Sequence, residues 1–134
     1  MQDAGKGIDL TLSEWAAAFS AGDIDVLLSL VSEDAEFWTH GMPAIIGRSA
    51  FREAFDTFFG AFSVVQVFDE KERLIGDGWA LLRGVEYNTL VPVSGGEPIE
   101  YLQRAFSVLR RESDGRWRFS RGMTNQESQV QETH

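Results

Sequence analysis

The stretch that decides the fold runs from residue 15 to residue 62 and reads WAAAFSAGDIDVLLSLVSEDAEFWTHGMPAIIGRSAFREAFDTFFGAF. Its apolar residues recur every three or four positions at both ends, which is typical of amphipathic helices. The middle predicts two short strands, Ala35–Thr39 and Ala44–Ile46, joined by a turn at Gly41-Met42-Pro43. The predicted order is therefore helix, helix, short hairpin, helix.

Glycines and capping residues predict the ends of the three helices. Thr11 and Glu14 have the spacing of a capping box and predict the start of the first helix. Gly22 is a natural stop, and Asp23 is the expected cap of the second helix. Ser49 is the expected cap of the third helix.

Aromatic residues cover one face of the third helix. Five phenylalanines recur there at intervals of three and four, so their rings share that face. Such a face can be ordinary core, or part of it can line a cavity, and the sequence leaves both interpretations open. The five are Phe51, Phe55, Phe58, Phe59 and Phe62.

After residue 63 the apolar period changes from 3.6 to 2, which predicts strands. Turn signals, including Gly76-Asp77-Gly78 and Asp114-Gly115, separate them. Helices followed by strands imply an α+β fold: three N-terminal helices packed on a curved antiparallel sheet, with a hollow between them that suits a small ligand. The four predicted strands cover residues 65–75, 79–91, 99–111 and 116–123.

The overall charge is strongly acidic. The 134 residues include 21 Asp and Glu against 12 Lys and Arg, a formal net charge of -9. This charge disfavours nucleic acids and anionic membrane surfaces, which bind proteins through Lys and Arg. Cysteine is missing from the sequence, which excludes disulfides and thiolate chemistry and fits a reducing cytoplasm.

We predict one domain over residues 1–134, with a core of about 10–126 and polar tails at both ends. Residues 1–8 are expected to fray. They lack the basic segment and apolar run of a secretory signal, and no apolar stretch is long enough to cross a bilayer. The expected location is the cytoplasm.

The faces of the long strands follow from alternation, but which face lines the hollow stays open. Glu86 shares a face with Leu82, whereas Tyr87 belongs to the opposite face. Glu86 and Arg104 could form a cross-strand ion pair, which is favoured over a catalytic role.

Three segments together resemble the nuclear transport factor 2-like superfamily, and within it the bacterial SnoaL-like domains. They are AFSAGDIDVLLSLVSEDAEF, GMPAIIGRSAFREAF and the final DGRWRF. The resemblance implies a cone-shaped α+β half-barrel with an interior pocket, and a homodimer formed through the outer sheet face. Relatives include ketosteroid isomerases, polyketide cyclases, epoxide hydrolases, dehydratases and associative domains, so the fold does not decide the function.

The resemblance to ketosteroid isomerases does not extend to their three catalytic residues. The isomerase tyrosine falls on Trp15 and its base on Thr39, which cannot abstract a carbon-bound proton at neutral pH. Its neutral aspartate falls near Gln103 to Ala105, where no acid is present. Steroid isomerase activity is therefore not expected, and cyclase activity is disfavoured.

His40 is the candidate catalytic residue, because it is the only histidine apart from the C-terminal residue. A surface or dimer-contact role for His40 stays open. If Glu36 faces water, alternation places Phe37 and Thr39 inward, and Trp38 and His40 on the other face. The candidate ligand-pocket residues are Trp15, Phe19, Phe37, Trp38, Thr39, Phe55, Phe59, Tyr87 and Gln103.

Two functions follow from these observations. The first is binding of a small, mostly apolar molecule, with isomerase, cyclase or hydratase-type chemistry and no cofactor. The second is a non-catalytic dimeric association domain with a vestigial pocket. The sequence has neither a phosphate-binding glycine loop nor a spacing of His and acids that suggests a metal site.

Overall fold

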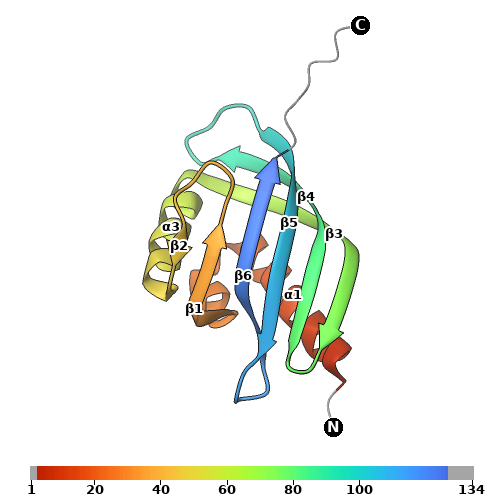
Figure 1. The fold of residues 1–134 in the computed structure, drawn as a ribbon. Coiled ribbons are helices and arrows are strands. Elements are labelled where there is room, and N and C mark those ends of the chain that lie inside the picture. The colour runs from red at the N-terminus through yellow and green to blue at the C-terminus, as the bar shows by residue number, and fades with distance from the viewer. Residues whose placement is uncertain (1–2, 127–134) are drawn as a thin grey trace, which may run out of the picture.

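The computed structural model describes residues 3–126, in which three helices cover one face of a curved, open six-stranded sheet (Figure 1). The strand order is β2-β1-β6-β5-β4-β3. This arrangement confirms the predicted α+β class. The elements are α1 (Ala4–Ala21), α2 (Ile24–Ser29), β1 (Val31–Trp38), β2 (Ile45–Ile46), α3 (Arg48–Ala61), β3 (Phe62–Gly76), β4 (Trp79–Pro92), β5 (Ile99–Arg111) and β6 (Trp117–Gln126).

The first strand differs from its prediction in length and in pairing. It begins at Val31, four residues early, and runs parallel to β6, with Phe37 opposite Gly122. Its predicted hairpin with β2 is present, with Phe37 opposite Ile45. The sheet is therefore mostly, not wholly, antiparallel, because the last strand inserts between β1 and β5.

The first helix begins earlier than predicted, so the expectations of a frayed tail through residue 8 and of a capping box at Thr11 are wrong. Asp3 is the N-cap, and its Oδ1 accepts a hydrogen bond from Gly5 N at 3.0 Å. Ile8 is fully buried and anchors this first part of α1. Thr11 lies inside the helix, and its hydroxyl donates to the backbone oxygen of Trp117 at 2.7 Å.

The other helix boundaries depend on two glycines and one carboxylate. Gly22 ends α1 with a φ of 67°, in the left-handed region that glycine adopts without strain. Asp23 caps α2 as predicted, accepting from Val26 N. Gly47, rather than Ser49, precedes α3, and its N–H donates to Ala35 O at 2.8 Å.

The core lies between the helices and one face of the sheet. Ala80 and Leu82 of β4 and Leu109 of β5 belong to it, which decides the face that sequence alone left open. Even-numbered residues of β4 and odd-numbered residues of β5 point inward. No helix in the described part of the chain is long and apolar enough to cross a membrane.

Candidate functional site

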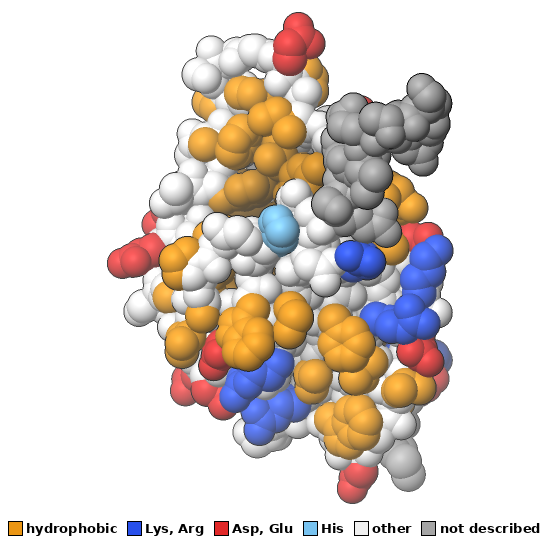
Figure 2. All heavy atoms as spheres, turned by 45° about the horizontal axis from the view of Figure 1, so that its top comes forward, with side chains coloured by type: hydrophobic (Ala, Val, Ile, Leu, Met, Phe, Trp, Pro, Cys, Tyr) orange, Lys and Arg blue, Asp and Glu red, His pale blue; other side chains and the backbone are white. Residues whose placement is uncertain are grey.

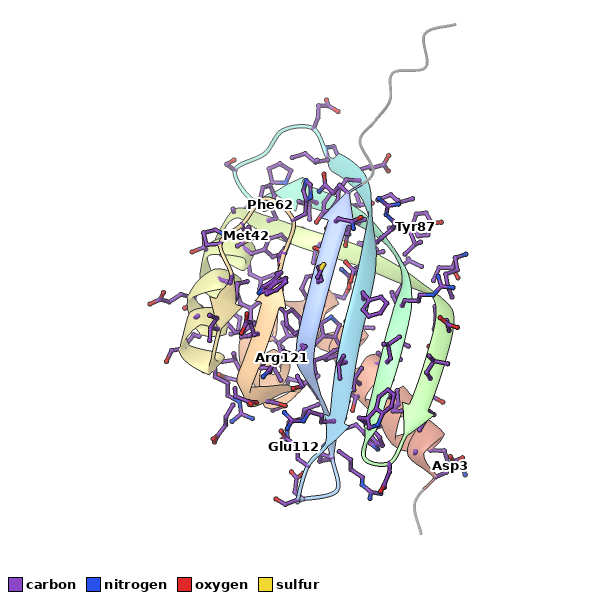
Figure 3. The ribbon with its side chains drawn as sticks, viewed as in Figure 1. Asp3, Met42, Phe62, Tyr87, Glu112 and Arg121 are labelled. Atoms are coloured by element: carbon purple, nitrogen blue, oxygen red, sulfur yellow. The ribbon has the colours of Figure 1, made fainter. Side chains whose placement is uncertain are left out.

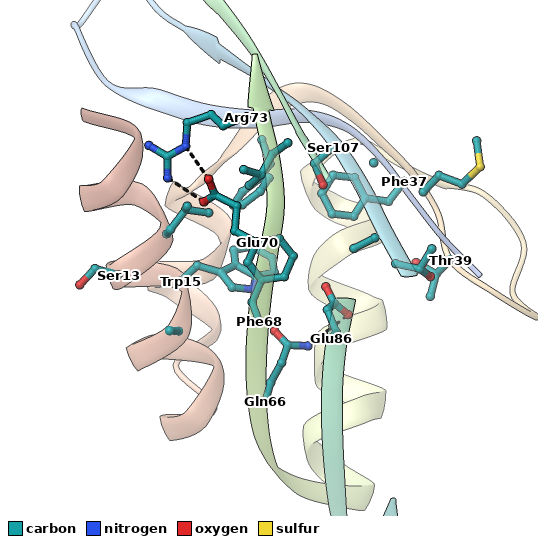
Figure 4. Close-up of a pocket in the computed structure, with 18 of the residues that line it drawn as sticks. Ser13, Trp15, Phe37, Thr39, Gln66, Phe68, Glu70, Arg73, Glu86 and Ser107 are labelled. Carbon is teal, nitrogen blue, oxygen red and sulfur yellow. Dashed lines mark hydrogen bonds and ion pairs between the residues drawn. The ribbon is translucent and has the colours of Figure 1, made fainter. Parts of the chain in front are cut away.

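A cavity of about 370 Å³ lies between α1 and the inner face of the sheet (Figure 4). Helix α1 contributes one wall, and the inward positions of the strands contribute the rest. Most of the wall is apolar, and polar groups occupy a few positions. The apolar lining includes Leu12, Trp15, Phe37, Phe68, Leu82 and Phe119, and the polar lining includes Asp9, Ser13, Thr39, Gln66, Glu70, Arg73, Glu86, Ser107 and Thr124.

Glu86 on β4 carries a carboxylate into this cavity (Figure 4). Its Oε1 accepts a hydrogen bond from Gln103 Nε2 at 2.6 Å and a longer one from Gln66 Nε2 at 3.4 Å. Gln66 also donates to Asn88 Oδ1 at 2.8 Å. Within residues 3–126, Oε2 of Glu86 accepts no hydrogen bond of ordinary length, although the nearby Asn88 amide still lowers the pKa of the carboxyl. One oxygen is thus held by amides, while the other remains available to a ligand.

The surroundings of Glu86 favour its protonated form. Burial raises the pKa of the Glu86 carboxyl above its usual value of 4.5, and the hydrogen bond from Gln103 opposes this shift. Tyr101 shares the inner face of β5, and burial together with the charge of Glu86 raises the pKa of its phenol. A carboxyl whose pKa is raised by burial holds its proton more tightly, which suits a group that donates and accepts a proton in catalysis.

A second polar group closes the cavity between α1 and β3. Arg73 Nη2 contacts Glu70 Oε1 at 2.8 Å and Asp9 Oδ1 at 2.8 Å. The hydrogen bonds to Glu70 raise the pKa of the Arg73 guanidinium, so it stays charged. Because both carboxylates engage Arg73, these contacts fasten the first turns of α1 to the edge strand.

Four of the predicted pocket residues lie at or beside this cavity. Trp15, Phe37 and Thr39 line it, from α1 and from the end of β1. Gln103 is not part of the lining, and its amide supports Glu86 from behind. The alternation proposed for β1 is therefore observed at Phe37 and Thr39.

The other helical candidates form an aromatic network rather than cavity wall. Phe19 stacks on Trp15 with ring centroids 5.9 Å apart and contacts Phe59 edge-on at 5.3 Å. Phe55 contacts Trp15 at 6.1 Å. These rings join α1 to α3 and do not line the cavity. Of the two interpretations of the phenylalanine face, ordinary core packing therefore fits these rings.

Three candidates lie outside the cavity. Trp38 and Tyr87 are 54% and 47% exposed, and alternation puts both on the outer face of the sheet, where Figure 3 shows Tyr87. His40 is exposed at the surface, where its backbone N–H donates to Thr124 Oγ1 at 3.1 Å (Figure 2). Its neighbour Thr39 lines the cavity, but His40 does not.

The proposed ion pair between Glu86 and Arg104 is wrong. Glu86 is opposite Gln103, whereas Arg104 is opposite Val85, so the two side chains leave opposite faces of the sheet. Arg104 is exposed and donates to Asn125 Oδ1 at 2.8 Å. The sequence did contain one signal for the role of Glu86, since it shares its face with Ala80 and Leu82.

Metal-binding groups are not clustered in the described part of the chain. Within residues 3–126, no three side chains of His, Cys, Asp or Glu come together as metal ligands. The acids that line the cavity are held by Arg73 or by amides. The polar groups of the described site offer acid–base and hydrogen-bonding chemistry, centred on Glu86.

Fold and cavity together define the class of protein: an α+β protein with a nuclear transport factor 2-like fold and an interior cavity. The sequence narrows this class to a family. The model of the SnoaL-like domain matches residues 12–119, and the chain belongs to this family. No curated protein matches the sequence.

Solved structures with this fold are numerous. A conserved protein from Planctomyces limnophilus DSM 3776 is 25% identical with a TM-score of 0.83, over 92% of this chain and 97% of that one. A ketosteroid isomerase-like protein from Erwinia carotovora atroseptica SCRI1043 is 20% identical with a TM-score of 0.84, over 96% and 99%. A nuclear transport factor 2-like superfamily protein from Salmonella enterica subsp. enterica serovar Typhimurium str. LT2 is 16% identical with a TM-score of 0.82, over 96% of both. The last two comparisons show the fold alone.

Proposed function

We propose that this protein binds a small, mostly apolar molecule in the cavity between α1 and the sheet, with Glu86 as its polar anchor. The observation that carries the proposal is the combination of apolar walls and one inward carboxylate with an unused oxygen. This is the usual composition of a small-molecule site, in which a few polar groups orient an otherwise apolar ligand.

Glu86 also gives the site a group that can move a proton. The chemistry we propose is cofactor-free isomerisation, cyclisation or hydration, with Glu86 as acid and base. The similarity to a ketosteroid isomerase-like protein is compatible with such chemistry. Here, however, the carboxyl is that of Glu86 in the middle of β4, whereas the position of the isomerase base, after the end of β1, holds Thr39.

The test is to block the cavity without disturbing the fold. Ala16 and Ala17 are both exposed on α1, but only Ala16 lines the cavity. Small aromatic and alicyclic compounds are added to the protein, and the amide chemical shifts are measured. The shifts of cavity residues such as Leu82 and Ser107 should change in the wild type and in Ala17→Trp. Ala16→Trp should abolish these shifts. Shifts confined to the outer sheet face, or equal shifts in both variants, would refute the proposal.

A second candidate function is dimeric association through the outer face of the sheet. Large apolar side chains are exposed there, and Figure 2 shows such side chains across the sheet surface. Antiparallel sheets commonly leave one face to water, and water favours polar residues, so these exposed apolar residues fit contact with a second copy. The residues are Trp38, Val65, Val67, Trp79, Tyr87 and Phe106.

A further inference from the structure

Glu86 is a half-buried carboxyl whose hydrogen-bond partners are all neutral amides. Gln103 and Gln66 donate to Oε1, and no Lys or Arg among residues 3–126 forms an ion pair with this carboxyl. Removing a carboxylate from water without a counter-ion is costly, and amide hydrogen bonds offset only part of that cost. A cation bound in the cavity would offset this cost by pairing with the ionised carboxylate of Glu86.

The one cation that lines the cavity is already neutralised. Arg73 contacts both Glu70 and Asp9 at 2.8 Å, and its side chain is only 18% exposed. Three carboxylates, of Asp9, Glu70 and Glu86, thus line the cavity against one guanidinium. The net charge of -9 of the whole chain has the same sign, so an anionic ligand meets repulsion both on approach and inside.

Aromatic rings supply the rest of the recognition. Trp15, Phe37, Phe68 and Phe119 line the same cavity as Glu86. A cation is attracted to the face of an aromatic ring by the ring's quadrupole, and this attraction is stronger where water is excluded. A carboxylate beside several rings suits an ammonium group attached to an apolar body.

We infer that the ligand of this cavity is a small organic cation: a protonated amine whose ammonium pairs with Glu86 and whose apolar body lies among the aromatic rings. The inference rests on the proposed function, because it concerns the ligand of the same cavity. It adds the charge of that ligand. A neutral ligand, which would accept a hydrogen bond from protonated Glu86, is the competing outcome.

The experiment compares three probes that share a 2-phenylethyl group and carry different charges. They are 2-phenylethylamine, 2-phenylethanol and 3-phenylpropanoate, and their affinities are measured from amide chemical shifts at neutral pH. The amine should bind at least about tenfold more tightly than the alcohol, and the carboxylate most weakly, because only the amine gains the charge pair and the ring contacts.

Two variants connect this preference to Glu86. Glu86→Gln should reduce the affinity for the amine by about tenfold, to that of the alcohol. Glu97→Gln removes the same charge from the loop after β4, outside the cavity lining, and should leave the ratio unchanged. An alcohol that binds as tightly as the amine, or a preference that survives Glu86→Gln, would overturn the inference and leave the proposed function standing. If none of the three probes binds, the proposed function fails with it.

Discussion

Glu86 owes its properties to its position on β4. A glutamate at an outward position of the same strand would be solvated, with an ordinary pKa. At the inward position, burial and two amide donors change both its pKa and its availability to a ligand. Glu86 is therefore the residue on which the proposed ligand binding and proton transfer depend.

Burial of Glu86 makes the stability of the protein depend on pH. The pKa of Glu86 is higher in the folded state than in the unfolded state, so the folded state binds its proton more tightly. Glu86 therefore makes its whole contribution to the free energy of unfolding at pH values below its pKa in the unfolded state, near 4.5. This contribution is lost as the pH rises through the higher pKa of the folded state. Neighbouring Tyr101 keeps its proton over this range, because its own pKa is raised.

Glu86→Gln should remove the loss of stability that accompanies ionisation of the Glu86 carboxyl. The free energy of unfolding of the variant, relative to wild type, should rise between about pH 4 and neutral pH, as measured by urea unfolding. Glu97→Gln, at an exposed loop position, serves as the control and should follow the wild type. Parallel curves for wild type and Glu86→Gln would show that the carboxyl titrates alike in both states.

Thr11 provides a second test at a single residue. Thr11→Val keeps the side-chain shape but removes the donor to Trp117 O and leaves that buried oxygen unpaired. The free energy of unfolding should fall by about 1–2 kcal/mol. Thr57→Val on the exposed face of α3 is the matched control and should change it by less than about 0.5 kcal/mol. If both variants lower the free energy of unfolding equally, the cause is the lower helix propensity of valine and not the lost hydrogen bond.

Among the elements, α1 is the one that connects core and cavity. Its Ile8 side chain is buried in the core, its Trp15 faces the cavity, and its Asp9 forms an ion pair with Arg73 of β3. The helix approaches β6 closely at Gly7, where an added Cβ would lie 2.6 Å from Trp117 Cδ1. Close approach, rather than helix propensity, explains a glycine at this position.

Two glycines in α1 should therefore respond in opposite ways to alanine. Gly5→Ala meets nothing closer than 3.4 Å and should raise the free energy of unfolding by about 0.5–1 kcal/mol, because alanine favours the helix. Gly7→Ala gains the same propensity but displaces the buried Trp117 ring, and should lower it by about 1–3 kcal/mol. Stabilisation by Gly7→Ala, measured by thermal unfolding, would contradict this packing.

At the scale of the whole molecule, the sheet separates two surfaces with different roles. Its inner face carries the core and the cavity, and its outer face exposes large apolar side chains. The first function proposed for the chain uses the inner face, and dimeric association uses the outer one. The two can coexist because they use opposite faces of the same strands.

The outer face makes a prediction about assembly. The wild type should sediment as a dimer, and Phe106→Glu should sediment as a monomer, because it places a charge on the apolar surface where Phe106 is 46% exposed. Val93→Glu alters a residue that is 66% exposed in the loop after β4 and should remain dimeric. A monomeric wild type at micromolar concentration would remove the association proposal.

The order of the elements and the class of fold follow from local sequence patterns. Periodicity placed three helices before the long strands, Asp23 marked a cap, and the resemblance of residues 18–37, 41–55 and 114–119 indicated the family. These features depend on neighbours a few positions apart, which the sequence displays directly. The start of α1 was missed because its anchor is tertiary: Ile8 is buried in the core and Thr11 bonds to Trp117.

The face of each long strand that points inward depends on packing between elements far apart in the sequence. Alternation defines two faces but does not rank them when both carry apolar residues, as in β4. Packing of the helices on the face of Ala80 and Leu82 brought Glu86 inside and left Tyr87 outside. The same packing separated Glu86 from Arg104, so the residue first interpreted as half of an ion pair became the carboxyl group of the cavity.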